Sequence, residues 1–308
     1  MPITRLGNPP AVRSDTTVAA PSAPAAATEP VAPSPTDDFS TPAPAVRGPA
    51  LSQPSMPGWV VANAVTYGTG TGDSLYINDV EAKDPVQGAL GDCYLVATLS
   101  AYAQSRPEVL KKAITENADG TFTVRLFKRE QVSHGPRAPA SYRFVGHEVR
   151  IDAQLPRYFG VIPVFARGQM PQELWAPLIE KAYAQLHGGY DKIEGDFPSK
   201  VMEALTGEYA STRLNFFFST DGTFDRIDRA LRRNQPVTAA TFRPELAGLV
   251  PGHAYTVLSA GEENGQRYVE LRNPWGRGEP ARDGQDDGVF RLTPGEFKKN
   301  FPGVFIDD

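Results

Sequence analysis

A single cysteine, Cys93, limits how this 308-residue chain can be held together. One thiol excludes an internal disulfide framework and any metal site built from several cysteines. The fold must therefore rest on a hydrophobic core, and hydrophobic residues make up 40% of the chain, which is enough for a sizeable one. A thiol that has to stay free also favours a reducing compartment.

The segment around the cysteine predicts a reactive position. Cys93 ends the stretch Gln87-Gly88-Ala89-Leu90-Gly91-Asp92-Cys93, and an apolar run follows it. Asp92 is a good N-cap, so we expect a buried helix that begins at Cys93. Backbone N–H groups at a helix start, together with a nearby imidazole, are expected to lower the pKa of the thiol. Free cysteines are also common in cores, but Gly88 and Gly91 favour a tight loop here.

Two later residues complete a nucleophilic arrangement. His253 stands between Pro251-Gly252 and an apolar predicted strand, and Asn273 ends the next predicted strand. An imidazole can take the thiol proton, and a carboxamide oxygen can hold the imidazole in one tautomer. We therefore predict Cys93 as nucleophile, His253 as base and Asn273 as the group that orients the base.

Further side chains have expected roles around these three. The Gln87 amide could donate to a developing oxyanion alongside the Cys93 N–H. Trp275 could shield the bond between His253 and Asn273 from water. The remaining histidines lack a comparable setting and are expected to be surface or packing residues: His134, His147 and His187.

Periodicity predicts a helix-rich part followed by a strand-rich part. Expected helices cover residues 93–103, 107–110, 174–186, 199–205 and 223–233, and expected strands cover 122–126, 143–151, 237–241, 254–260, 267–271 and 289–292. Residues 1–57 differ, since roughly two in five are Pro or Ala. Such a segment cannot bury enough apolar surface to fold, so we expect a disordered tail. Two interpretations of it stay open: a linker, or an export signal that needs no hydrophobic core, as in a type III effector.

Charge and hydropathy exclude several classes of protein. The net charge is −5 and the pI is about 5.5, so no basic face is expected for nucleic acid or acidic lipid. No apolar run approaches the ~18 residues of a membrane-spanning helix. The N-terminus lacks the apolar core of a secretory signal, and no EF-hand loop pattern appears.

At this point the chain resembles the calpain family of papain-like cysteine proteases. The matching stretches, in the family's order, are Gln87–Cys93, Glu173-Leu174-Trp175 through Glu180-Lys181-Ala182-Tyr183-Ala184, Gly252-His253-Ala254-Tyr255, and Leu271-Arg272-Asn273-Pro274-Trp275-Gly276. The resemblance spans residues 75 to 305. It implies that Cys93, His253 and Asn273 are the catalytic residues and Gln87 the oxyanion donor. Tyr94 stands where animal calpains usually have Trp.

The resemblance implies an α+β papain-like fold with two subdomains and a cleft between them. The helix-rich subdomain, 58–215, would carry Cys93, and the strand-rich subdomain, 216–308, would carry His253 and Asn273. The implied function is a calpain-like endopeptidase that makes limited cuts in protein substrates. It would act in the cytoplasm, or as a secreted bacterial effector in a host cytosol. Two alternatives stay open: a papain-like acyl transferase or deconjugating enzyme, and an inactive binding module.

Calpain cores also bind calcium in each half. Asp84 and Glu173 match the acidic ligands of the first site, whereas in the second half Asp287 matches but Val289 stands in place of a Glu. Two carboxylates fall short of the roughly 6–8 oxygens that calcium takes, unless backbone carbonyls complete the shell. The alternative is that Asp84 and Glu173 pair with Arg or Lys.

Overall fold

The computed structural model describes residues 49–61, 65–132, 141–280 and 284–307. The predicted disordered tail lies outside these ranges up to residue 48. Residues 51–57, which the sequence also placed in that tail, pack against the folded part. The Leu51 N–H donates to Asp152 Oδ2 at 2.6 Å, and Pro54 and Pro57 are buried.

Helices and strands mix along the described chain. The helices are α1 (Gly58–Val61), α2 (Cys93–Ser105), α3 (Pro107–Ala113), α4 (Trp175–His187), α5 (Pro198–Thr206), α6 (Thr220–Arg232) and α7 (Pro294–Asn300), with short 3-10 helices η1 (Tyr190–Lys192) and η2 (Asn215–Phe217). The strands are β1 (Val65–Gly68), β2 (Ile114–Glu116), β3 (Phe122–Val132), β4 (Ser141–Ile151), β5 (Leu155–Tyr158), β6 (Ile162–Pro163), β7 (Ser211–Leu214), β8 (Val237–Ala240), β9 (Ala254–Glu263), β10 (Gln266–Arg272), β11 (Val289–Leu292) and β12 (Gly303–Ile306).

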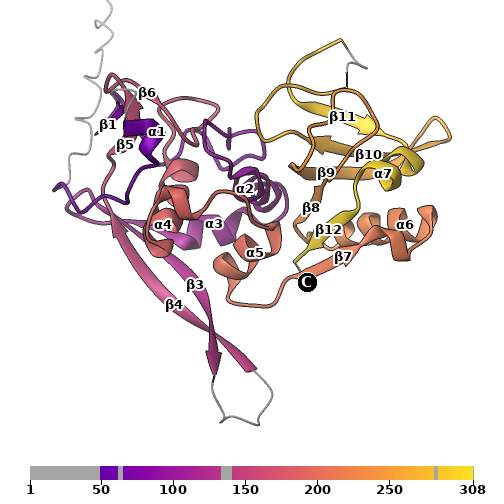
Figure 1. The fold of residues 1–308 in the computed structure, drawn as a ribbon, viewed down its shortest axis with the longest axis horizontal. Helices are drawn as coiled ribbons and strands as arrows, with labels where there is room; N and C mark the ends of the chain where they lie inside the picture. The colour runs from indigo at the N-terminus through magenta and orange to yellow at the C-terminus, as the bar shows by residue number, and fades with distance from the viewer. Residues whose placement is uncertain (1–48, 62–64, 133–140, 281–283, 308) are drawn as a thin grey trace, which may run out of the picture. The chain divides into compact units, whose positions relative to one another are not determined.

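Helix α2 is the central element, and it begins at Cys93 as predicted. Residues Tyr94 to Ala103 are all buried, which agrees with the apolar sequence of this run. Pro107 begins α3 directly after α2 ends. Figure 1 shows α2 with α3, α4 and α5 on one side and β8 and β9 on the other. Thr256 Oγ1 of β9 donates to the Ala97 carbonyl at 2.8 Å, so the helix is bonded directly to that strand.

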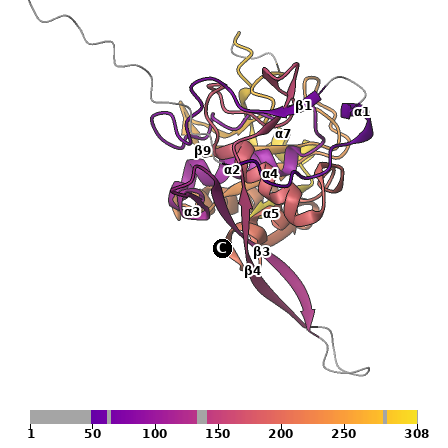
Figure 2. The same ribbon diagram turned by 90° about the vertical axis from the view of Figure 1, so that its left-hand side faces the viewer.

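The predicted pairing of strands near residues 122 and 151 is confirmed. β3 and β4 are antiparallel over their whole length, from Phe122 opposite Ile151 to Val132 opposite Ser141. β2 pairs with the other edge of β3. In Figures 1 and 2 the paired strands extend away from the helices. The outer half of this hairpin therefore lies apart from α2.

The strand-rich part is one antiparallel sheet with the order β11-β10-β9-β8-β12-β7. The four strands predicted after Pro236 are present and lie next to one another. β12 and β7 were not predicted, because neither has a clear alternation of polar and apolar side chains. Helix α7 begins with a capping box between Thr293 and Glu296.

The antiparallel pairing of β9 with β10 places two predicted site residues at one end of the sheet. The strands are antiparallel, with Arg272 opposite Thr256. His253 comes just before β9 begins, and Asn273 just after β10 ends, so the two are neighbours across the pair. The register shifts by one residue between Glu270 and Leu271, and such a bulge re-aims the residues that follow it.

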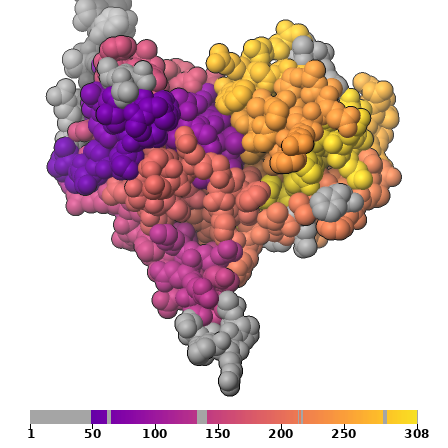
Figure 3. Space-filling model, viewed as in Figure 1, coloured from indigo at the N-terminus to yellow at the C-terminus, as the bar shows by residue number. Residues whose placement is uncertain are grey.

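Buried side chains form two hydrophobic clusters. The first is built mainly from residues 60–205 and includes α2, while the second runs from Phe224 to Ile306 and includes the large sheet. Figure 3 shows the two parts as indigo-to-magenta and orange-to-yellow surfaces that meet. β7 joins the large sheet although it precedes residue 216. The division of the chain at residue 215 stays a prediction.

Candidate active site

Cys93 is half-buried at the first position of α2. The backbone N–H of Ala254, the residue that follows His253, lies near the thiol and favours its ionised form. The helix of the first part and the sheet of the second therefore meet at the sulfur. Cys93 therefore lies near the start of β9, which His253 directly precedes.

His253 and Asn273 form the predicted pair. His253 Nε2 lies 3.0 Å from Asn273 Oδ1, and His253 is 5% exposed while Asn273 is fully buried. The Asn273 amide has a defined orientation, since its Nδ2 donates to the Gly278 carbonyl at 2.6 Å. Oδ1 also accepts the Trp275 N–H at 3.1 Å. His253 Nε2 must therefore carry the proton, and the lone pair is left on Nδ1, where a base needs it.

Aromatic rings enclose this imidazole. The Trp275 ring lies 4.8 Å from the His253 ring, at an angle of 49°, and the Tyr255 ring lies 5.0 Å away, edge to face. Trp275 itself is 37% exposed. It covers the His253–Asn273 bond on one side, which agrees with the shielding position expected for it.

The electrostatics differ from the sequence-based expectation at the sulfur. Burial raises the pKa of the Cys93 thiol, and the Ala254 N–H and the amides at the start of α2 offset this only in part. Burial likewise lowers the pKa of His253, against the hydrogen bond to Asn273. The expected lowering of the thiol pKa is therefore wrong for this arrangement. Both shifts disfavour a thiolate–imidazolium pair in the free protein.

Gln87 is held in a rigid loop next to Cys93. Its side chain is 8% exposed, and Nε2 donates to the Leu90 carbonyl at 2.7 Å. An amide nitrogen has two protons, so one remains for another acceptor. The loop is rigid because Gly88 packs on backbone: a Cβ there would overlap the carbonyl oxygens of Val164 and Phe165. The role of Gln87 as an oxyanion donor stays a prediction.

Two hydrogen bonds that the sequence did not reveal join the loop before Cys93 to the loop after β10. The Gln87 N–H donates to the Pro274 carbonyl at 2.9 Å. Arg272 Nη2 donates to the Lys83 carbonyl at 2.7 Å, and Arg272 is only 2% exposed. Burial lowers the pKa of Arg272 to about 10, against the attraction of Asp84 and Asp287. The sequence does not show which group will contact a buried Arg, so only the folded structure could identify the contact between Arg272 and Lys83.

The predicted metal ligands Asp84 and Glu173 are buried and close enough to repel each other. Glu173 Oε1 accepts the Ile77 N–H at 2.8 Å, and Asp84 Oδ2 accepts the Glu81 N–H at 2.6 Å. Burial raises the pKa of Glu173 to about 7, and the Asp84 charge adds to the effect. Burial also raises the pKa of Asp84. No ion pair in the described part of the chain joins either carboxylate to Lys or Arg, so the alternative of a simple salt bridge is not met.

These two carboxylates fit a cation only in part. Within the described residues, no group of three or more His, Cys, Asp or Glu side chains could hold a metal ion. A shell around Asp84 and Glu173 would therefore need carbonyl oxygens as well. In the second half, Asp287 is exposed and accepts the Val289 N–H at 2.9 Å, which makes it a turn residue.

His187 and His147 lie away from this site, as the sequence predicted, and His134 lies outside the described residues. His187 Nδ1 lies 2.8 Å from the Tyr183 carbonyl at the end of α4, and its ring packs on Tyr183. His147 lies within β4. His134 falls in residues 133–140, which the structure does not describe.

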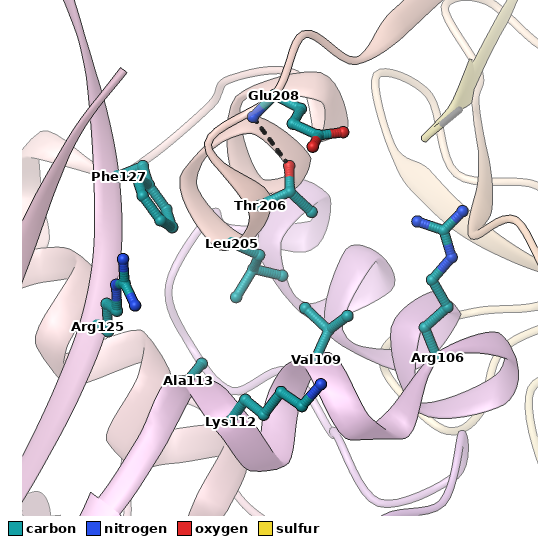
Figure 4. Close-up of a pocket in the computed structure, with 9 residues that line it drawn as sticks. All are labelled: Arg106, Val109, Lys112, Ala113, Arg125, Phe127, Leu205, Thr206 and Glu208. Carbon is teal, nitrogen blue, oxygen red and sulfur yellow. Dashed lines mark hydrogen bonds between the residues drawn. The ribbon is translucent and has the colours of Figure 1, made fainter.

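A separate cavity of about 310 Å³ lies at the opposite end of α2 from Cys93. Figure 4 shows its lining, with Val109, Ala113 and Leu205 forming an apolar wall and Arg106, Lys112 and Arg125 around it. Arg106 caps the C-terminus of α2, a helix of 13 residues and so about 20 Å long. This cavity therefore takes no part in the chemistry at the thiol.

In the described residues, none of the helices is both long and apolar enough to cross a bilayer.

Comparison with known proteins agrees with this geometry. A family profile described as calpain family cysteine protease matches residues 67–287. The chain is 34% identical over 212 residues to calpain-12 of Mus musculus, which covers 65% of this chain and 27% of that protein. It is 29% identical over 213 residues to calpain-type cysteine protease DEK1 of Arabidopsis thaliana, which covers 65% of this chain and 9% of that protein.

The fold comparison is weaker. Procathepsin L2 from Tenebrio molitor larval midgut is 20% identical over 37% of this chain and 36% of its own, with a TM-score of 0.23. The chain spans well under two thirds of the length of the curated relatives quoted above.

Cys93 begins a buried helix, and this helix packs against an antiparallel sheet that carries a His–Asn pair. This is the arrangement of an α+β papain-like core. The family profile covers more than half of the 308 residues. The chain belongs to the calpain family of cysteine proteases.

Proposed function

We propose that this chain is a calpain-like cysteine endopeptidase that makes limited cuts in protein substrates through an acyl-enzyme on Cys93. The observation that carries the proposal is the His253–Asn273 bond of 3.0 Å directly before the strand whose first residue, Ala254, lies near the Cys93 thiol. The tautomer fixed by the bond to Asn273 leaves Nδ1 as the unprotonated imidazole nitrogen.

The chemistry follows from these positions. His253 Nδ1 takes the thiol proton, and the Cys93 sulfur attacks the carbonyl carbon of the scissile peptide bond. The resulting oxyanion accepts the Cys93 N–H and the remaining proton of the Gln87 amide. The imidazolium then gives its proton to the leaving amine, and the C–N bond breaks. Water, with His253 as base, hydrolyses the thioester and releases the acid.

Asn273 and Trp275 support this cycle without contacting the substrate carbonyl. Asn273 Oδ1 holds the Nε2 proton in both charge states of the ring, so the imidazole cannot rotate. Trp275 covers that bond and keeps water from competing for it. Burial works against charge at both Cys93 and His253. We infer that the ion pair forms mainly when substrate occupies the site.

The direct test compares wild type with Cys93→Ala and Cys93→Ser on casein. We expect both variants to lose at least about 10⁴-fold in rate, because the acyl-enzyme cannot form on Ala and forms poorly on a hydroxyl. A thiol-directed epoxide should label wild type at Cys93 only. Casein cleavage that survives Cys93→Ala would reject the proposal.

The same experiment separates the two alternatives. Incorporation of an amine donor without peptide cleavage would favour a papain-like acyl transferase or deconjugating enzyme. Absence of both reactions, with Cys93 still unlabelled by the epoxide, would favour an inactive binding module.

We also propose that Asp84 and Glu173 hold calcium together with neighbouring carbonyl oxygens. Support comes from two buried carboxylates that repel each other and have no ion-pair partner in the described part of the chain. When bound, the ion would supply positive charge between them. Arg272 donates to the carbonyl of Lys83, the residue directly before Asp84. The loop that would hold the ion is therefore tied to the loop that carries Asn273.

The compartment follows from the thiol. A catalytic cysteine that must stay reduced suits the cytoplasm, or a host cytosol reached by export. The proposed substrates are proteins with flexible segments that can enter between the two subdomains, 58–215 and 216–308.

A further inference from the structure

Asp92 occupies the N-cap position of α2 but does not cap it. Its side chain makes no hydrogen bond to the first turn, and the residue is fully buried. Neither carboxyl oxygen has an N–H or O–H donor in the described part of the chain. Asp92 is thus the N-cap residue, as the sequence predicted, but its carboxyl group does not make the side-chain capping bond. A carboxyl group directly before the nucleophile is instead turned into the protein interior.

The group that Asp92 meets there is another carboxyl. Glu180 of α4 is 1% exposed, and its Oε1 accepts the Ala166 N–H at 2.9 Å. The Asp92 and Glu180 carboxyl groups are close enough to interact directly, although no donor in the described part of the chain bonds either Asp92 oxygen. A carboxylate only accepts, so a bond between two carboxyl groups requires a proton on one of them.

Among the described residues, no cationic side chain acts on the pKa of Asp92 or Glu180. Besides Glu180, the titratable groups that interact electrostatically with Asp92 are the Glu194 carboxylate, the Cys93 thiol, and the hydroxyls of Tyr94 and Tyr190. The Tyr67 hydroxyl faces Glu180 from β1. Lys181 follows Glu180 in sequence, but its ammonium contacts Asp152 Oδ1 at 2.6 Å.

Two adjacent carboxylates without a counter-ion cannot both be ionised in a buried site. We propose that Asp92 and Glu180 share one proton at neutral pH, and that this hydrogen-bonded pair positions the start of α2, and with it the nucleophile, against α4. Asp92 and Glu180 are positioning residues, because they act through Cys93 rather than on the substrate. The shared proton does not depend on the proposed function; only the expected effect of the pair on catalysis rests on it.

The acid–base properties of the pair agree with this proposal. Burial raises the pKa of Asp92 to about 7, and burial together with the Asp92 charge raises the pKa of Glu180 well above its usual range. The two titrate as one unit, with one proton held through neutral pH. The Asp92 charge also raises the pKa of the Cys93 thiol. Loss of the shared proton would therefore make the thiolate harder to form and break the link to α4.

The sign of the effect on stability follows from linkage. A carboxyl whose pKa is raised in the folded state favours folding fully at pH values below its unfolded pKa of about 4. That contribution is lost as pH rises toward the raised pKa. The proton shared by Asp92 and Glu180 should therefore make the protein less stable as pH increases, and it should set an alkaline limit to activity.

The decisive variant is Glu180→Gln, because its amide can donate to the Asp92 carboxylate without a titrating proton. At pH 8 the infrared spectrum of wild type should contain the carbonyl stretch of one protonated carboxyl, and Glu180→Gln should lack it. Glu203→Gln is the matched control, since Glu203 is also buried but pairs with Arg129 at 3.3 Å. Its spectrum should keep that band. These spectra do not depend on catalysis, so they can fail independently of the proposed function.

Two further measurements test positioning. The unfolding free energy of Glu180→Gln should vary less with pH than that of wild type between about pH 5 and 9. The alkaline decline of kcat/KM should move to higher pH. Glu180→Ala should lose roughly 10-fold or more relative to Glu180→Gln in kcat/KM, because it leaves Asp92 without a partner.

The proposal is overturned if wild type has no protonated-carboxyl band at pH 8, or if Glu180→Gln retains it. It is also overturned if Glu180→Gln and Glu180→Ala have the same pH profile as wild type. If Glu180→Ala does not fold, the comparison of Glu180→Gln with Glu203→Gln still decides.

Discussion

Arg272 donates a hydrogen bond to the carbonyl of Lys83 at 2.7 Å, and this contact joins the two parts of the molecule next to the active site. Arg272 immediately precedes Asn273, the residue that holds the imidazole. Lys83 immediately precedes Asp84, the predicted calcium ligand. A second bond, from the Gln87 N–H to the Pro274 carbonyl, runs beside the first. The orientation of His253 is therefore tied to the loop that carries Gln87, the predicted oxyanion donor.

Arg272→Gln tests this connection. We expect the free energy of unfolding to fall by about 1–3 kcal/mol, because the buried Arg272 guanidinium and its hydrogen bond to the Lys83 carbonyl are lost. The value of kcat should fall more than KM rises, since Asn273 loses its support. Arg291→Gln is the control: Arg291 pairs with Glu263 and Glu270 on the surface of the sheet, and such pairs contribute at most about 1 kcal/mol. Unchanged kcat in a destabilised Arg272→Gln protein would contradict the connection.

The charge state of the thiol in the free protein can be measured by alkylation. Burial raises the pKa of Cys93, so the proton is held to higher pH, and burial lowers the pKa of His253, so the imidazole is neutral at pH 7. The rate of labelling by iodoacetamide should therefore rise steadily as pH increases through and beyond about 8.5. Cys93 is the only cysteine, so Cys93→Ala sets the background. A rate that is constant from about pH 5 to 8 would instead indicate a preformed thiolate–imidazolium pair.

Gly88→Ala should damage the loop that holds Gln87. A Cβ at this position overlaps the carbonyl oxygens of Val164 and Phe165, and backbone cannot move aside as a side chain can. We expect a loss of about 1–3 kcal/mol in stability and a larger relative loss in kcat/KM. Gly295→Ala is the matched control, because an added Cβ at Gly295 meets nothing within 4 Å. Thermal unfolding and casein cleavage measure both effects, and equal behaviour of the two variants would refute the account of this loop.

Calcium should stabilise the protein through Asp84 and Glu173. An ion that binds only the folded state adds about 2.7 kcal/mol when it is present at 100 times its dissociation constant. We expect Tm to rise on addition of calcium and to return with a chelator. The increase should disappear in Asp84→Asn and in Glu173→Gln and persist in Asp287→Asn, whose carboxylate is exposed. A flat response of both Tm and cleavage rate from chelator to millimolar calcium would remove calcium from the proposal.

Much of the local structure was predictable from the sequence. The apolar run after Asp92 predicted α2, and the spacing of Trp175, Leu178 and Ile179 predicted α4. These elements are long and strongly patterned, so local preference and burial agree. The short strands β7 and β12 were missed because their pairing depends on strands far away in the sequence.

The sequence by itself determined which chemistry is available, because a lone thiol, an imidazole and a carboxamide stand in motifs that resemble the calpain family. Only the tertiary structure determined the pKa shifts of those groups and the contacts between them. Burial sets the protonation of Cys93 and His253, and packing turns Asp92 away from its helix cap toward Glu180. Desolvation and contacts between distant segments arise only when the chain has folded, so no local pattern could reveal them.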